Sequence, residues 1–156
     1  MSVKIPKLIF SIGLCLGAGV LGSFFTISAI PNWYTTLNKP SFSPPNWIFG
    51  PVWTALYILM GISLYLVWIS KSKAKQNALN LFFVQLGLNA LWSIVFFGLH
   101  SPFLALLTIV ILWAMIVLTM RAFFGISKTS GRLLVPYLVW VSFAAYLSYS
   151  IWVLNR

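Results

Sequence analysis

The sequence predicts an all-α integral membrane protein, a single domain over residues 1–156 that forms a bundle of five transmembrane helices. Of the 156 residues, 61% are hydrophobic and only 6% are charged, whereas soluble domains carry about 25% charged residues. Such a chain has too little polar surface to cover a globule in water. In addition, five stretches contain the roughly 20 apolar residues that a helix needs to cross a bilayer core.

The five predicted spans follow one another along the chain and are separated by turn-forming segments. They cover about 7–29, 47–69, 78–98, 103–124 and 133–154. The intervening segments are a Pro- and Trp-rich loop at 30–46, then SKSKAKQN, HSP and GISKTSG, and all have compositions typical of loops. The first apolar run is too long for the core of a signal peptide. We therefore expect it to be the first helix of the bundle.

Basic residues are concentrated at one end of the predicted bundle. The chain has ten Lys and Arg and no Asp or Glu. Eight of the ten fall on the side of the N-terminus: Lys4, Lys7, Lys71, Lys73, Lys75, Arg121, Lys128 and Arg132. Lys39 and Arg156 fall on the other side. An excess of basic residues marks the cytoplasmic side, so we expect a cytoplasmic N-terminus in a bacterial cell membrane.

The placement of these cations also bears on partners. They lie at the ends of apolar runs, where basic side chains contact anionic lipid headgroups. A nucleic-acid-binding protein would instead gather its basic residues on one face or along one helix. We therefore expect membrane lipids as partners and no nucleic acid.

The lack of acidic residues excludes several kinds of catalytic site. Carboxylate pairs, Asp-supported triads and acidic metal cages all need Asp or Glu. Cys15 is the only cysteine and His100 the only histidine, so the chain offers neither an internal disulfide nor a cluster of metal ligands. We expect no metal site and no required cofactor.

Polar and aromatic side chains recur at helical spacing within the spans. Gln85 and Asn89 share a face of the third span with Ser93 and Phe96. An unpaired amide in hydrocarbon costs roughly 2–7 kcal/mol, so both amides are expected to point into the bundle. They serve there either as contacts between helices or as the polar floor of a cavity. Similar stripes are Trp53 with Tyr57 in the second span, and Tyr137, Trp140, Ala144 and Ser148 in the last.

The first span carries a pattern of small residues. Gly13 and Gly17 form a GxxxG motif, which lets helix backbones approach closely in lipid. Two alternatives stay open, which are packing within one chain and a dimer interface.

Three long segments carry a resemblance to known proteins. They are WYTTLNKPSFSPPNWIFGPVWTALY, LGLNALWSIVFFG and LVPYLVWVSFAAYLSYSIWVLN, in this order between Trp33 and Asn155. They resemble the signature blocks of the TspO/MBR family, the tryptophan-rich sensory proteins and translocator proteins, also called peripheral-type benzodiazepine receptors. The resemblance implies a homodimer and a cavity under the first loop. It also implies the ligands of that cavity, which are porphyrins such as protoporphyrin IX or heme, sterols in some members, and synthetic hydrophobic ligands.

The resemblance further implies which residues bind the ligand. The residues matched by the resemblance are Trp33, Tyr34, Pro40, Pro44, Pro45, Trp53, Asn89, Trp92, Trp140 and Ala144. The predicted ligand-binding set also takes in Tyr57, Phe96 and Tyr137, which share helix faces with these residues. In the family, the positions of Trp53 and Trp140 are implicated in light-dependent porphyrin breakdown. These two residues are therefore the candidates for a catalytic role.

The prolines of segment 30–46 predict a stiff connection. Each proline fixes φ, removes a backbone donor and disfavours helix at the preceding residue, so the loop loses little entropy on ordering. Together with the aromatic residues Trp33, Tyr34 and Phe42 within it and Trp47 and Phe49 just after it, the segment is expected to form a semi-rigid lid. The alternative is a stiff spacer whose aromatic rings sit at the membrane interface.

Three functions are compatible with these features. The first is a membrane receptor or transporter that binds porphyrins or other hydrophobic molecules and serves tetrapyrrole transport, sensing or stress regulation. The second is a light-dependent porphyrin-degrading enzyme that uses Trp53 and Trp140. The third is a regulatory membrane protein whose partner responds to ligand occupancy.

Overall fold

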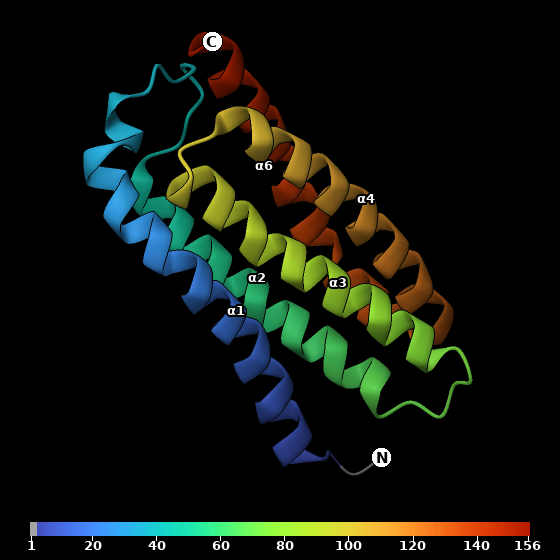
Figure 1. The fold of residues 1–156 in the computed structure, drawn as a ribbon. Helices are drawn as coiled ribbons and strands as arrows, with labels where there is room; N and C mark the ends of the chain where they lie inside the picture. The colour runs from blue at the N-terminus through green and yellow to red at the C-terminus, as the bar shows by residue number, and fades with distance from the viewer. Residues whose placement is uncertain (1–2) are drawn as a thin grey trace.

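The computed structural model describes residues 3–156, which form a bundle of long helices (Figure 1). Its elements are α1 (Ile5–Asn32), η1 (Tyr34–Thr36), α2 (Asn46–Trp68), α3 (Lys75–Ser93), η2 (Ile94–Gly98), α4 (Pro102–Ile126), α5 (Lys128–Leu133) and α6 (Val135–Leu154). When α3 is joined with η2 and α5 with α6, five helical segments of these residues are long and apolar enough to cross a membrane. No strand occurs in residues 3–156. The predicted all-α fold with five spans is confirmed.

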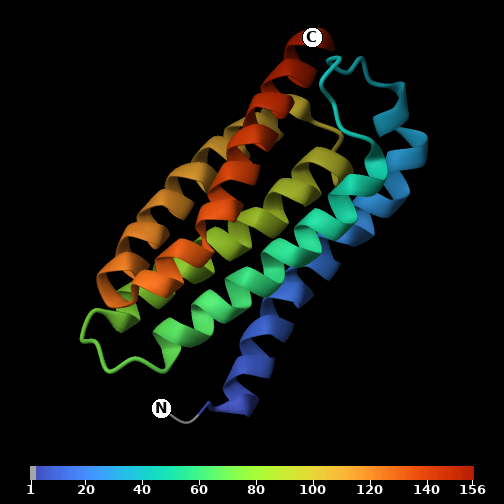
Figure 2. The same ribbon diagram turned by 180° about the vertical axis from the view of Figure 1, so that it is seen from behind.

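The helices pack around a core that runs the length of the bundle. Helix α1 packs on α2 and α3, α3 on α4, and α4 on α6, while α5 contacts both α2 and α4 (Figure 2). Met60, Phe82, Phe123 and Tyr137 are fully buried among them, and the rings of Phe82 and Phe123 stack with centroids 5.6 Å apart. The two chain ends lie at opposite ends of the bundle (Figure 1).

One glycine sets the distance between α1 and α2. A Cβ atom on Gly61 would lie 2.5 Å from the Ile12 Cα atom, so only glycine permits this backbone contact. In contrast, Gly13 and Gly17 are exposed, and a Cβ atom on either would meet nothing within 4 Å. The GxxxG motif therefore makes no close contact within the described chain.

The last span begins earlier than the sequence indicated. The segment GISKTSG was expected to be a loop before residue 133, but Lys128–Leu133 is helical, so that boundary was wrong. Ser127 caps this helix by accepting a hydrogen bond from the Ser130 backbone N–H at 3.2 Å. The Ser63 hydroxyl donates to the Ser130 carbonyl, and the Ser130 hydroxyl donates to the Ser63 carbonyl. These tertiary contacts with α2 stabilise a turn that local composition did not predict.

The first span also ends later than expected, because α1 continues through Pro31 to Asn32. A proline so close to a helix end removes a single backbone hydrogen bond, so it shortens the helix very little.

The first loop is fixed to the end of α6 rather than free. The Asn155 side chain accepts from the Asn38 backbone N–H at 3.0 Å and donates to the Asn38 carbonyl at 2.9 Å. Phe42 stacks on Tyr146 of α6 with ring centroids 5.2 Å apart. The loop is thus held over the end of the bundle that contains the C-terminus.

Candidate functional site: an aromatic cavity between α1, α2 and α3

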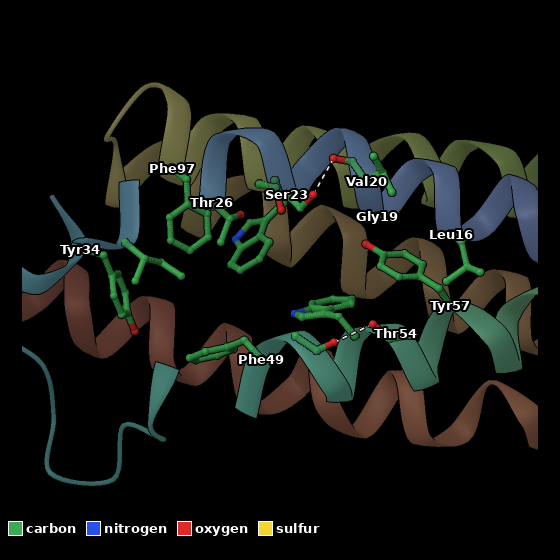
Figure 3. Close-up of a pocket in the computed structure, with 15 residues that line it drawn as sticks. Leu16, Gly19, Val20, Ser23, Thr26, Tyr34, Phe49, Thr54, Tyr57 and Phe97 are labelled. Carbon is green, nitrogen blue, oxygen red and sulfur yellow. Dashed lines mark hydrogen bonds between the residues drawn. The ribbon is translucent and has the colours of Figure 1, made fainter. Parts of the chain in front are cut away.

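A cavity of about 430 Å³ lies in the half of the bundle next to the first loop. Its walls come from α1, α2 and the end of α3 with η2 (Figure 3). The lining residues are Leu16, Gly19, Val20, Ser23, Thr26, Ile30, Tyr34, Phe49, Gly50, Trp53, Thr54, Tyr57, Trp92, Ser93 and Phe97. Small-molecule pockets typically measure about 300–1,000 Å³ and are mostly apolar, and this cavity meets both conditions.

The α1 wall is made of small and hydroxyl-bearing residues at helical spacing. Figure 3 shows Gly19, Ser23 and Thr26 facing the cavity from one side of this helix. A Cβ atom on Gly19 would lie 2.5 Å from the Tyr57 ring, so the glycine makes room for the tyrosine. The Ser23 and Thr26 hydroxyls donate to carbonyls of their own helix. Their oxygen lone pairs stay free to accept from a ligand.

Aromatic rings form the opposite wall. Trp53 of α2 stacks on Tyr57 with centroids 5.6 Å apart and lies 6.4 Å from the Trp92 ring of α3. The Trp92 indole nitrogen is buried and has no hydrogen-bond partner among the described residues. An unpaired buried donor is costly, and this nitrogen is enclosed by its neighbours rather than exposed to the cavity space.

The end of the cavity nearest the first loop is closed by Tyr34 and Phe97 (Figure 3). Phe97 lies in η2, a π-helical turn, and such turns often occur at functional sites. Phe96 and Phe97 both pack against Tyr34, with ring centroids 6.1 and 5.8 Å away, and of the two only Phe97 lines the cavity. Burial raises the pKa of the Tyr34 hydroxyl, with a smaller opposing effect from Ser43, so Tyr34 stays neutral at physiological pH.

A chain of buried hydrogen bonds supports the cavity wall from behind. The Tyr57 hydroxyl donates to Asn89 Oδ1 at 2.5 Å, and Asn89 Nδ2 donates to the Tyr137 hydroxyl at 2.9 Å. The Tyr137 hydroxyl then donates to Gln85 Oε1 at 2.9 Å. Gln85 and Asn89 are 0% and 1% exposed, which confirms that both amides point into the bundle. The chain links α2, α3 and α6 and holds the Tyr57 ring at the cavity.

The structure brings four of the predicted ligand-binding residues to the cavity lining: Tyr34, Trp53, Tyr57 and Trp92. Asn89 and Tyr137 lie one layer behind, in the hydrogen-bond chain. Trp140 contacts the lining residue Phe49 with centroids 6.0 Å apart.

The other predicted residues lie outside the lining. Phe96 is buried and meets the Trp33 ring edge to face with centroids 5.5 Å apart, while Trp33 stacks on His100 at 4.5 Å. Ala144 is buried in the core cluster of the bundle. Pro40, Pro44 and Pro45 belong to the first loop, and Pro45 precedes the first residue of α2.

The predicted lid is only partly realised by the loop aromatics. Tyr34 and Phe49 line the cavity, whereas Phe42 covers Tyr146 and the Trp47 side chain is 73% exposed. Lys39 donates from Nζ to the Tyr34 carbonyl at 2.9 Å and lies 4.8 Å from the Tyr34 ring centroid. Its ammonium group is therefore separated from the cavity by the Tyr34 side chain.

The α1 contribution was missed because the sequence interpretation concentrated on aromatic and amide side chains. A signal was present, since Leu16, Gly19, Ser23, Thr26 and Ile30 are spaced by three or four residues and so lie on one helix face. Small and hydroxyl-bearing residues repeated in this way mark a face that borders space or another backbone.

The cavity lining is uncharged, with hydroxyl-bearing and aromatic side chains. No group of three His, Cys, Asp or Glu residues able to hold a metal ion occurs in the described part of the chain. The lining itself has one hydroxyl-rich side, one aromatic side and no charged residue. It suits a flat, largely apolar molecule.

Comparisons with known proteins give the family of this chain. The TspO/MBR family pattern matches residues 11–153. The tryptophan-rich protein TspO of Chlorobaculum tepidum is 50% identical and that of Archaeoglobus fulgidus 46% identical, with 98–99% of this chain and 99% of theirs covered. The human translocator protein is 37% identical over 95% of this chain and 89% of its own. The chain therefore belongs to the TspO/MBR family, and this membership supports a receptor- or transporter-like role for an integral, multi-pass membrane protein.

Proposed function

We propose that the cavity between α1, α2 and α3 binds a porphyrin, and that the protein acts as a membrane receptor or transporter for tetrapyrroles. The observation that carries this proposal is the aromatic lining: Trp53, Tyr57, Trp92, Phe49 and Phe97 surround one space of about 430 Å³. A porphyrin is flat, aromatic and apolar, and aromatic side chains contribute about 0.5–1.5 kcal/mol per ring pair beyond the area they bury. The ligand is cargo or signal in this proposal, and no cofactor is required.

Polar groups at the cavity suit the acidic edge of a porphyrin. Its two propionates need donors, and the Lys39 ammonium, which lies 4.8 Å from the ring centroid of the lining residue Tyr34, is a donor next to the cavity. The chain contains no Asp or Glu that would repel an anionic ligand. Other hydrophobic molecules of similar shape would meet the same aromatic walls.

The proposal is tested by titrating the purified protein with protoporphyrin IX in the dark and following tryptophan fluorescence. Because Trp53 and Trp92 line the cavity, saturable quenching with one porphyrin per chain is expected. Empty detergent micelles with free tryptophan serve as the blank. Quenching that rises without saturation, as in the blank, would contradict the proposal.

A second candidate is light-dependent degradation of the bound porphyrin, favoured by the position of Trp53. Its indole lines the cavity and stacks on Tyr57, so it is placed to give one electron to a photo-excited porphyrin, with dioxygen as the final oxidant. Trp140 reaches the cavity only through Phe49. The two tryptophans are therefore not equivalent in this structure.

We predict that Trp53→Phe and Trp140→Phe separate the two functions. Phenylalanine keeps an aromatic wall, so dark affinity should change by about 1 kcal/mol or less at either site. Phenylalanine is much harder to oxidise, so Trp53→Phe should abolish light-dependent loss of porphyrin absorbance if the protein is an enzyme, whereas Trp140→Phe should slow it less. If the double variant bleaches porphyrin at the parent's rate, neither indole has a chemical role and the binding function stands alone.

We also propose that the N-terminus is cytoplasmic in a bacterial cell membrane. Lys71 and Lys73 lie in the connection between α2 and α3, and Lys75 is the first residue of α3, at the end of the bundle where α1 starts (Figure 1). Lys39 lies in the first loop, at the end with the C-terminus. This asymmetry supports the orientation because basic residues are enriched on the cytoplasmic side.

The orientation predicts which engineered cysteines react in intact cells. An impermeant maleimide should label Ser43→Cys in the first loop and should label Gln76→Cys at the start of α3 only after the cells are opened. The native Cys15 is fully buried and provides an unlabelled background. Labelling of position 76 but not of position 43 in intact cells would show the opposite orientation.

A further inference from the structure

A second, smaller hollow lies in the other half of the bundle, outside the porphyrin cavity. Its volume is about 230 Å³, and it is lined only by apolar side chains of α1, α2 and α3: Phe10, Leu14, Leu64, Trp68, Leu79 and Phe83. It shares no lining residue with the larger cavity. Phe10 and Phe83 are 59% and 46% exposed, so the hollow opens to the outside of the bundle, and we call it the lower groove.

Two lysines, Lys7 and Lys75, lie at one end of the lower groove. Lys7 is one helical turn before Phe10 on α1, and its Nζ atom lies 4.8 Å from the centroid of the Trp68 ring. Lys75 is one turn before Leu79 on α3 and donates from Nζ to the carbonyls of Trp68 and Ser70 at 3.3 and 3.0 Å. Lys71 and Lys73 are exposed in the connection between α2 and α3. The groove thus has an apolar floor and a cationic entrance.

The protein contains no acidic side chain to neutralise this entrance. The chain has no Asp or Glu and a formal net charge of +10, so neither the chain itself nor a second copy packed against the groove supplies a side-chain carboxylate. Two copies meeting at this face would bring like charges together. The charge therefore favours an anionic occupant from outside the protein.

We propose that the lower groove binds an anionic phospholipid, with one acyl chain along the apolar floor and the phosphate at Lys7 and Lys75. The dimensions support this occupant. The seven residue-to-residue steps from Lys7 to Leu14 rise about 10 Å along α1, which is less than half of a hydrocarbon core of about 30 Å. A chain lying beside them stays within one leaflet and brings its headgroup to the level of the lysines. This inference does not depend on porphyrin binding in the other cavity.

The test compares phosphatidylglycerol with phosphatidylcholine, bound to the protein in a neutral detergent and measured by native mass spectrometry. One phosphatidylglycerol is expected to bind more tightly than any phosphatidylcholine. Lys7→Gln should weaken phosphatidylglycerol about fivefold, the usual effect of one basic residue on anionic lipid, and should leave phosphatidylcholine unchanged. Lys128→Gln is the matched control, because it removes one charge from α5, which lines no part of the groove.

A second variant tests the apolar half of the site. Leu79→Trp adds bulk to the groove floor and is expected to lower phosphatidylglycerol binding while circular dichroism stays helical. Equal binding of the two lipids, or equal losses for Lys7→Gln and Lys128→Gln, would overturn the proposal. So would efficient disulfide formation between two copies of Phe83→Cys in membranes, because a second chain would then cover the groove.

Discussion

Gly50→Trp is expected to lower the affinity for protoporphyrin about a hundredfold, or ~2.7 kcal/mol, without loss of the fold. Gly50 lines the cavity and lies on the same face of α2 as Trp53, Thr54 and Tyr57. A Cβ atom at position 50 meets nothing within 4 Å, so an indole attached there enters open space rather than pushing on a helix. The new side chain then occupies the volume that the porphyrin needs. Replacement of glycine within a helix also favours helix formation.

A matched control separates this blockage from a general effect of added tryptophan. Gly87 lies on α3, lines neither cavity, and a Cβ atom there also meets nothing within 4 Å. Gly87→Trp should therefore bind protoporphyrin like the parent. The measurement is the dark titration, with the thermal unfolding midpoint recorded for each variant. Parent-like affinity of a folded Gly50→Trp would show that porphyrin binds elsewhere.

The helical framework was predictable because its main cause is local. A run of about 20 apolar residues can cross a bilayer only as a helix, since every backbone group must be paired within the segment. The helix Lys128–Leu133 was not predictable on this basis. Its residues are polar and small, and it is stabilised by the Ser63–Ser130 hydrogen bonds to α2, which depend on how the bundle packs.

The candidate site was predictable in part, for a related reason. Trp53, Tyr57 and Trp92 are large aromatic residues inside apolar spans. Their residue types were therefore enough to predict which faces of α2 and α3 line the cavity. The α1 wall depends instead on the rotation of that helix, which is set by the backbone contact between Gly61 and Ile12. The sequence also left open whether Asn89 is a contact between helices or a cavity floor, and the structure places it between Tyr57 and Tyr137.

Asn89→Leu is expected to lower the free energy of unfolding by about 2 kcal/mol, even though it removes a polar group from the membrane interior. Asn89 accepts from the Tyr57 hydroxyl and donates to the Tyr137 hydroxyl. Leucine leaves the Tyr57 hydroxyl without an acceptor, and an unpaired buried donor costs about 1–3 kcal/mol. Tyr137 keeps its bond to Gln85 and loses less. Porphyrin affinity should fall as well, because Tyr57 lines the cavity and loses the contact that holds its ring.

The double variant Asn89→Leu with Tyr57→Phe identifies the unpaired hydroxyl as the cause. Removing both partners of a hydrogen bond costs less than removing one, so the double variant should be more stable than Asn89→Leu by about 1 kcal/mol. Asn80→Leu, at an exposed position of α3, should change stability by about 0.5 kcal/mol or less. The measurement is thermal or denaturant unfolding in detergent, analysed as a double-mutant cycle. Strictly additive losses for positions 57 and 89 would mean that their hydrogen bond contributes nothing to the fold, and that the Tyr57 ring is held at the cavity by packing against Trp53 and Gly19 alone.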